Sequence, residues 1–79
     1  MNEPTPTEED RRQVAIGAAW MNLRRQRVTL LSESDWTQFN DSPLSTEDKI
    51  KWAAYRQQLR DLPANTPDPT NVTWPVPPS

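Results

Sequence analysis

The sequence predicts an all-α protein, an antiparallel hairpin of two helices followed by an extended, proline-rich carboxyl-terminal tail. Two stretches each begin with a capping side chain and acidic residues, which is typical of a helix start. Prolines then gather in the last part of the chain, where their fixed φ angle and missing N–H exclude a continued helix. We therefore expect residues 1–62 to form a helical hairpin domain, with a connector at residues 32–44, and residues 63–79 to form the tail.

The first helix is expected to run from about residue 8 to residue 31. Thr7 is a candidate N-cap, and three acidic residues follow it in the first turn, where the positive end of the helix dipole favours carboxylates. Arginines gather near the other end, between residues 24 and 27, so the charge reverses in the direction that the dipole prefers.

The middle of this helix is apolar or small on nearly every side, from Val14 to Leu23, and one neighbouring helix cannot bury all of it. At ~1.5 Å per residue the first helix would be about 36 Å long and the second about 25 Å, so the amino-terminal third of the first should overhang. Three arrangements would cover this surface: the tail folds back over it, two copies of the chain pair through it, or another protein binds it. The small residues 17–19 would let a second backbone come close.

The second helix is expected at about residues 45–62, capped by Ser45 or Thr46 and stopped by Pro63. Its apolar side chains recur at i, i+3, i+7 and i+10, the pattern of a helix with one buried face. We predict that this stripe packs on residues 21–31 of the first helix. The stripe consists of Trp52, Tyr55, Leu59 and Leu62.

Arginines on both predicted helices are interpreted as a solvated face that also suits the dipole. Arg56 and Arg60 on the second helix belong to this group. The alternative is that they bind acidic groups on another protein.

The tail carries Val72, Trp74 and Val76 at a spacing of two residues. An extended segment presents alternate side chains to the surface on which it lies. We therefore expect this segment to be ordered against the protein's own helices or against a partner. Trp36 in the connector and Trp74 in the tail are either lids on the hairpin or anchors for a partner.

Composition excludes several classes of function. The 79 residues allow one small domain with a marginal core, and there is no cysteine or histidine to staple it or to bind zinc. A net charge of −2 argues against a nucleic-acid interface. No nucleophile has a base beside it, and the acidic clusters in the first helical turns lack the spacing of a calcium loop. We expect no catalysis, no cofactor, no metal, no signal peptide and no membrane span, and hence a cytosolic chain.

Residues 34–63, SDWTQFNDSPLSTEDKIKWAAYRQQLRDLP, and residues 71–78, NVTWPVPP, together carry five short elements in a recognisable order. The chain resembles the phage tail assembly chaperone family, also called tail fibre assembly proteins, over roughly residues 20–79. The resemblance implies a binding role without chemistry, in which the protein assists a phage fibre or tail protein.

The resemblance therefore favours a phage tail or tail-fibre assembly chaperone that acts in the host cell cytoplasm, with the virion tail as a second location. A small structural subunit retained in the virion is the first alternative, and a helical adaptor or antitoxin-like regulator is the second. The expected partner is a phage tail fibre or other tail protein, with self-association as a further possibility. The residues predicted to bind a partner are Val14, Ile16, Trp20, Trp36, Val72, Trp74 and Val76.

Overall fold

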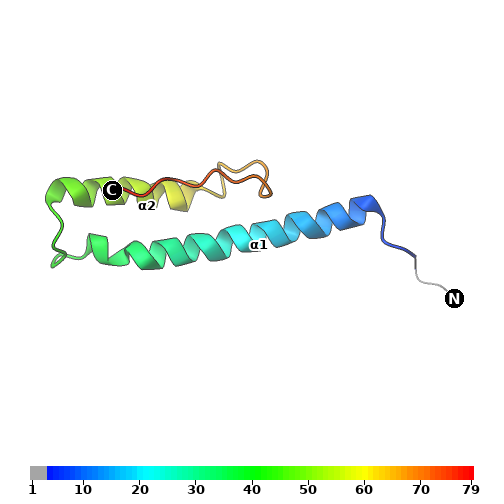
Figure 1. Ribbon diagram of the computed structural model, residues 1–79, viewed down its shortest axis with the longest axis horizontal. Helices are drawn as coiled ribbons and strands as arrows, with labels where there is room; N and C mark the ends of the chain where they lie inside the picture. Colours follow the sequence, from blue (N-terminus) through cyan, green and yellow to red (C-terminus); the bar gives the residue numbers. More distant parts are fainter. Residues whose placement is uncertain (1–3) are drawn as a thin grey trace.

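The computed structural model describes residues 4–79, and the first three residues of the amino-terminal segment lie outside the described part. Helix α1 spans Glu8–Ser34, the short 3-10 helix η1 spans Asp35–Gln38, and helix α2 spans Thr46–Asp61. Figure 1 shows α1 and α2 side by side and antiparallel, joined at one end by η1 and the following loop. The predicted all-α class is confirmed, because residues 4–79 contain these helices and no strand.

Helix α1 begins at the predicted N-cap. The Thr7 hydroxyl accepts a hydrogen bond from the Asp10 N–H at 3.1 Å, and the Asp10 carboxylate accepts one from the Thr7 N–H at 2.9 Å. This reciprocal capping box satisfies two of the N–H groups that a helix start leaves unpaired. The helix continues three residues past the predicted end, to Ser34, because no proline or glycine interrupts the chain there.

Helix α2 also begins at a predicted cap. The Ser45 hydroxyl accepts a hydrogen bond from the Asp48 N–H at 3.1 Å. The helix ends at Asp61, with Leu62 as C-cap and Pro63 following it. Proline restricts the residue before it and cannot donate to the helical ladder, which explains the stop.

The core is small and lies where the two helices face each other. Leu59 is fully buried and Leu23 is 2% exposed. Tyr55 and Leu62 are also buried, which confirms most of the predicted stripe on α2, whereas Trp52 is half-buried. Within residues 4–79 these four side chains form the hydrophobic core, and Pro69 of the tail is also buried, so the isolated fold rests on little apolar burial.

The contacts between α2 and α1 extend closer to the carboxyl end of α1 than the sequence predicts. The rings of Trp52 and Trp36 have centroids 6.4 Å apart, and the rings of Trp52 and Tyr55 meet edge to face at 5.6 Å. Trp52 and Tyr55 also line a shallow depression with Leu30 and Ser34. The aromatic part of the stripe therefore packs on α1 from Leu30 onward and on η1, so its contacts extend past the end of the predicted segment 21–31.

Residues 63–79, the tail, contain turns followed by a stretch without helix or strand. Thr66 tightens the first turn by donating to the Leu62 carbonyl at 2.6 Å. Figure 1 shows the chain then doubling back along α2, so that the carboxyl terminus lies over that helix. Trp74 lines one depression with Leu23 of α1 and another with Asp61 of α2, so the tail lies against both helices.

The molecule is elongated, with extents of 66 × 20 × 18 Å. Helix α1 projects past α2 and the tail at its amino-terminal end, as the helix lengths predict (Figure 1). Ala19 is the first residue of α1 that lines a depression with the tail, and we call residues 8–18, which precede it, the overhang. Within residues 4–79 no helix combines the length and the apolar character that a membrane span requires.

Candidate partner-binding surfaces

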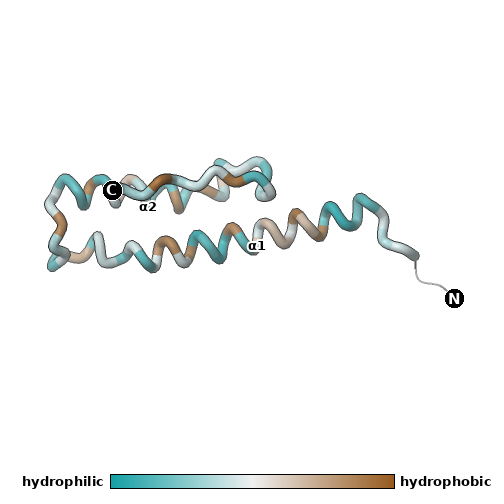
Figure 2. The backbone as a smooth tube through the Cα atoms, viewed as in Figure 1, coloured by the Kyte–Doolittle hydropathy of each residue, from teal (hydrophilic) through white to brown (hydrophobic). Residues whose placement is uncertain are grey.

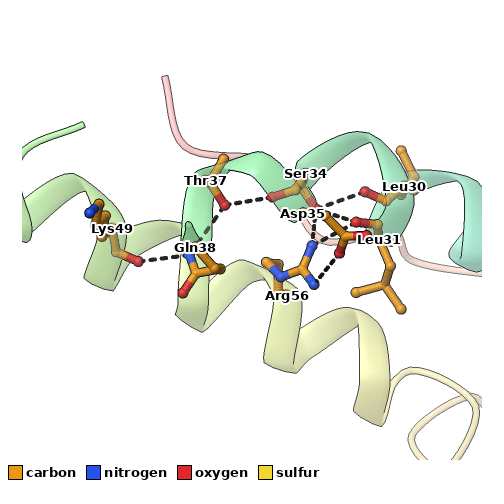
Figure 3. A network of polar contacts seen from close by, with 8 residues as sticks. All are labelled: Leu30, Leu31, Ser34, Asp35, Thr37, Gln38, Lys49 and Arg56. Carbon is orange, nitrogen blue, oxygen red and sulfur yellow. Dashed lines mark hydrogen bonds and ion pairs between the residues drawn. The ribbon is translucent and has the colours of Figure 1, made fainter. Parts of the chain in front are cut away.

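One polar network fixes the end of the hairpin that carries the connector (Figure 3). The Arg56 guanidinium donates to the Leu31 carbonyl at 2.6 Å, to the Ser34 hydroxyl at 2.7 Å and to the Asp35 carboxylate at 2.6 Å. Arg56 is only 7% exposed, so its interpretation as part of a solvated face is wrong. Its position explains the error: residue 56 follows Trp52 by four and precedes Leu59 by three, so it falls inside the buried stripe.

The same network continues into η1 and α2. Thr37 is fully buried and donates to the Ser34 carbonyl at 2.6 Å. The Gln38 side chain donates to the Thr37 hydroxyl and to the Lys49 carbonyl, both at 3.2 Å (Figure 3). The carbonyl groups at the end of α1 therefore find partners inside the chain, and the connector is held against both helices.

The first candidate surface is the connector end. Trp36 packs against Trp52 with one side of its ring, yet it is 45% exposed. It therefore covers the end of the hairpin and still presents apolar surface to a partner. Phe39 and Ile50 are more exposed still, at 56% and 64%. The sequence prediction omitted both residues. Phe39 is the only phenylalanine in the chain and stands in a polar connector, which is the signal that could have identified it.

The second candidate surface is the tail. Val72 and Trp74 are half-buried and share a depression with Ala19 and Leu23 of α1. Val76 is 83% exposed. The predicted alternation thus separates two roles, because Val72 and Trp74 contact the protein's own hairpin whereas Val76 is available to another molecule.

The third candidate surface is the overhang together with Trp20, which lies just after it, and the predicted residues there lie on different faces of α1. At about 100° per residue, Val14 and Ile16 are roughly 200° apart around the helix. Ile16 and Trp20 are half-buried and lie on the side of Leu23, which faces the hairpin. Val14 is 73% exposed and lies on the opposite side. One flat partner surface cannot contact Val14 together with Ile16 and Trp20.

The outward side of α1 carries exposed apolar residues that the sequence prediction did not group. Met21 is 61% exposed and Val28 is 60% exposed, and both lie on the side of Val14. The signal in the sequence is an alternating spacing of four and three residues, the heptad pattern of a helix seam. We call these residues the outer face of α1: Arg11, Val14, Ala18, Met21, Arg25 and Val28.

Two side chains have perturbed proton affinities. Burial, and secondarily the nearby Glu33 carboxylate, raises the pKa of Tyr55. Hydrogen bonds from the Thr70 hydroxyl and N–H lower the pKa of Asp68, which stabilises the turn before the tail doubles back. Both effects have structural causes and involve no grouping of reactive side chains.

The model of the family described as phage tail assembly chaperone protein matches residues 20–79 of the chain. No curated protein and no solved structure matches the chain. The matched range contains η1, α2, the tail and the part of α1 that packs on them. The overhang lies outside the matched range.

Proposed function

Because the chain belongs to the phage tail assembly chaperone family, we propose that it assists phage tail assembly by binding a tail or tail-fibre protein through its exposed apolar surfaces. Membership in a chaperone family suggests a role without catalysis. Binding of this kind would take place in the host cell cytoplasm, where tail proteins are assembled.

The observation that supports binding is the distribution of exposed hydrophobic side chains. Figure 2 shows hydrophobic residues continuing along α1 into the overhang, where neither α2 nor the tail lies beside them. The core buries few hydrophobic residues, whereas Trp36, Phe39 and Val76 are exposed. A partner that buried these exposed side chains would therefore stabilise the folded chain.

We propose two areas of contact for the tail protein. The first is the hairpin side of α1 at the overhang and the residues directly after it, with the half-buried Ile16 and Trp20. The second is the connector end, with Trp36 and its exposed neighbours. Val76 extends the exposed apolar surface of the tail, whereas Val72 and Trp74 serve the partner indirectly by holding the tail in place.

Co-expression with the tail and fibre proteins of the same phage tests the proposal. Affinity purification should recover one of them as the main associated polypeptide. The double variant Ile16→Asp, Trp20→Glu should lose this complex while circular dichroism shows nearly unchanged helix content. The exposed residue Gln57 offers a control, because Gln57→Lys adds a charge on α2 about two turns beyond Ile50 and should leave binding unchanged. Unchanged complex formation in the double variant would move the contact to the connector end or the tail.

The structural-subunit alternative uses the same surfaces and differs only in whether the protein remains bound. Mass spectrometry of purified particles separates the two, because a retained subunit stays in the virion at a fixed ratio to its partner. Purification of a host regulator in place of a tail protein would support the adaptor alternative and overturn the proposal.

A further inference from the structure

We propose that two copies of this chain pair antiparallel through the outer face of α1, with the symmetry axis passing near Gly17. The inference goes beyond the proposed function, because it uses the side of α1 opposite to Ile16 and Trp20 and requires no phage protein.

The outer face is suited to a second helix by its spacing and its position. Its residues recur at intervals of three, four, three, four and three, which aligns them along one side of a helix and forms a coiled-coil seam. At about 100° per residue, the centre of this seam lies roughly 180° from Leu23, which is buried against the hairpin. A second copy can therefore dock without displacing α2 or the tail.

Gly17 provides an independent reason for close approach. It lies in the middle of α1, and a Cβ atom built on it would meet nothing within 4 Å. Glycine in a helix interior is less favourable than alanine, and no neighbouring atom of residues 4–79 requires its small size. Ala18, the next residue in the chain, is also small and belongs to the outer face. Small residues at these positions let two helix backbones approach closely.

The antiparallel register follows from the charges. Asp10 and Arg24 lie on one flank of the outer face, each seven residues from Gly17. When two helices pair antiparallel about Gly17, Asp10 of each copy lies beside Arg24 of the other. The ion pairs within residues 4–79 are Arg12–Glu9, Lys51–Glu47 and Arg56–Asp35, and neither Asp10 nor Arg24 takes part in them. Asp10 accepts the capping bond from Thr7 with one carboxylate oxygen, which leaves the other for the second copy.

The same register fills the groove at the start of α1. Arg11, Val14, Ala15 and Ala18 line this groove, and the segment 4–6 forms its outer wall. In the antiparallel pair, Met21 of the second copy lies opposite Arg11, and Ala18 of the second copy lies opposite Val14. The unbranched methionine side chain can adapt to such a groove, and the aliphatic part of Arg11 can cover it. The interface is isologous, so each contact occurs twice.

Sedimentation equilibrium of the full chain over a wide concentration series tests the pairing. The wild type should pass from one chain to two as concentration rises. Gly17→Leu should remain a single chain with unchanged helix content, because its side chain has open space in the monomer and blocks the second backbone in the pair. Ala54→Leu, which places the same leucine side chain at an exposed position on α2, should dimerise as the wild type does.

The register is tested by reversing charges. In a dimer of the Asp10→Lys variant, Lys would lie beside Arg24 at both contacts. In a dimer of the Arg24→Glu variant, Glu would lie beside Asp10 at both contacts. Each repulsion should weaken dimerisation by about tenfold. An equimolar mixture of the two variants restores both pairs and should dimerise more tightly than either variant alone, although Asp10→Lys also removes one bond of the capping box. Arg60→Glu, on the exposed side of α2, is the control for the change in net charge.

A wild type that stays a single chain throughout would overturn the pairing, as would dimerisation of Gly17→Leu with wild-type affinity. A mixture no tighter than its components would overturn the antiparallel register. If the wild type is monomeric and Gly17→Leu instead loses the co-expressed tail protein, the outer face belongs to that protein and the dimer is wrong.

Discussion

Arg56 joins three parts of the chain through one guanidinium. Two of its nitrogens bind the end of α1 and the start of η1, while its Nε is buried without a partner within residues 4–79. Because the Asp35 side chain is 53% exposed, water screens the ion pair, and the bonds to Leu31 and Ser34 contribute more. The residue therefore acts as a side-chain cap on the carboxyl end of α1.

Replacing Arg56 with Ala should lower the free energy of unfolding by on the order of 2 to 3 kcal/mol, because it leaves a helix-end carbonyl and a buried hydroxyl without their charged donor. Arg56→Lys should recover only part of this loss, since an ammonium group cannot reproduce the planar fork. Urea denaturation measures both. Arg60→Ala, one turn further along the same helix, should change stability by less than about 0.5 kcal/mol. Equal effects of the two alanine variants would contradict the capping role.

Tyr55 should make the free energy of unfolding depend on pH in the alkaline range. Its pKa is raised above the ordinary value of 10.0 by burial and by Glu33. The unfolded chain loses the phenolic proton first, so the contribution of Tyr55 is fully present below the unfolded pKa and is lost as pH rises through the folded pKa. We expect the free energy of unfolding of the wild type to fall above pH 10 more steeply than that of Tyr55→Phe. Parallel profiles for the two proteins would show that the phenol does not titrate differently on folding.

At the scale of elements, the helix starts were predictable and the helix contacts were only partly so. Thr7 and Ser45 are local signals, since a cap needs a side chain and N–H groups a few residues away. The register depends on Arg56 reaching Leu31 across 25 positions of sequence, and no local pattern encodes that bond. The periodicity of α2 identified its buried face correctly, but the assumption that arginines face solvent removed Arg56 from it.

For the tail, the sequence predicted contacts either with the protein's own helices or with a partner, and it could not distinguish the two. The structure places Trp74 against both helices and leaves Val76 exposed. Trp74→Ala should therefore destabilise the hairpin by about 1 to 2 kcal/mol, less than the 3 to 5 kcal/mol of a fully buried aromatic residue, because the ring is half-buried. Thermal denaturation followed by circular dichroism measures it.

Val76→Ala is the matched control in the same segment and should leave stability unchanged. Deleting residues 71–79 should cost at least as much as Trp74→Ala, since Pro77 also lines a depression with Leu30 and Trp52. If the truncated chain melts with the wild type, the tail is only a spacer.

At the scale of the whole molecule, the sequence predicted that α1 is apolar on more than one side, but it could not assign each residue to a neighbour. Val14 and Ile16 looked like one interface because they are close in sequence and both hydrophobic. The position of Leu23 against the hairpin shows that they face opposite directions, and this information comes only from packing. The overhang therefore has two apolar sides that can be occupied independently.

The stability of the overhang should depend on what binds it. Residues 8–18 are the end of α1 that extends past α2 and the tail, and among them only Ile16 is half-buried, so few tertiary contacts hold this end of the helix. Amide hydrogen exchange of the dilute protein should thus be fast in residues 8–18 and slow around Leu23 and Leu59, which are buried.

Raising the protein concentration should slow exchange in the overhang of the wild type but not of Gly17→Leu. Adding a bound tail protein should slow it in both, because that partner is proposed to use the side of Ile16 and Trp20. Strong protection of residues 8–18 in dilute protein alone would mean that the overhang is stable without any neighbour, and neither proposed contact would then be needed to order it.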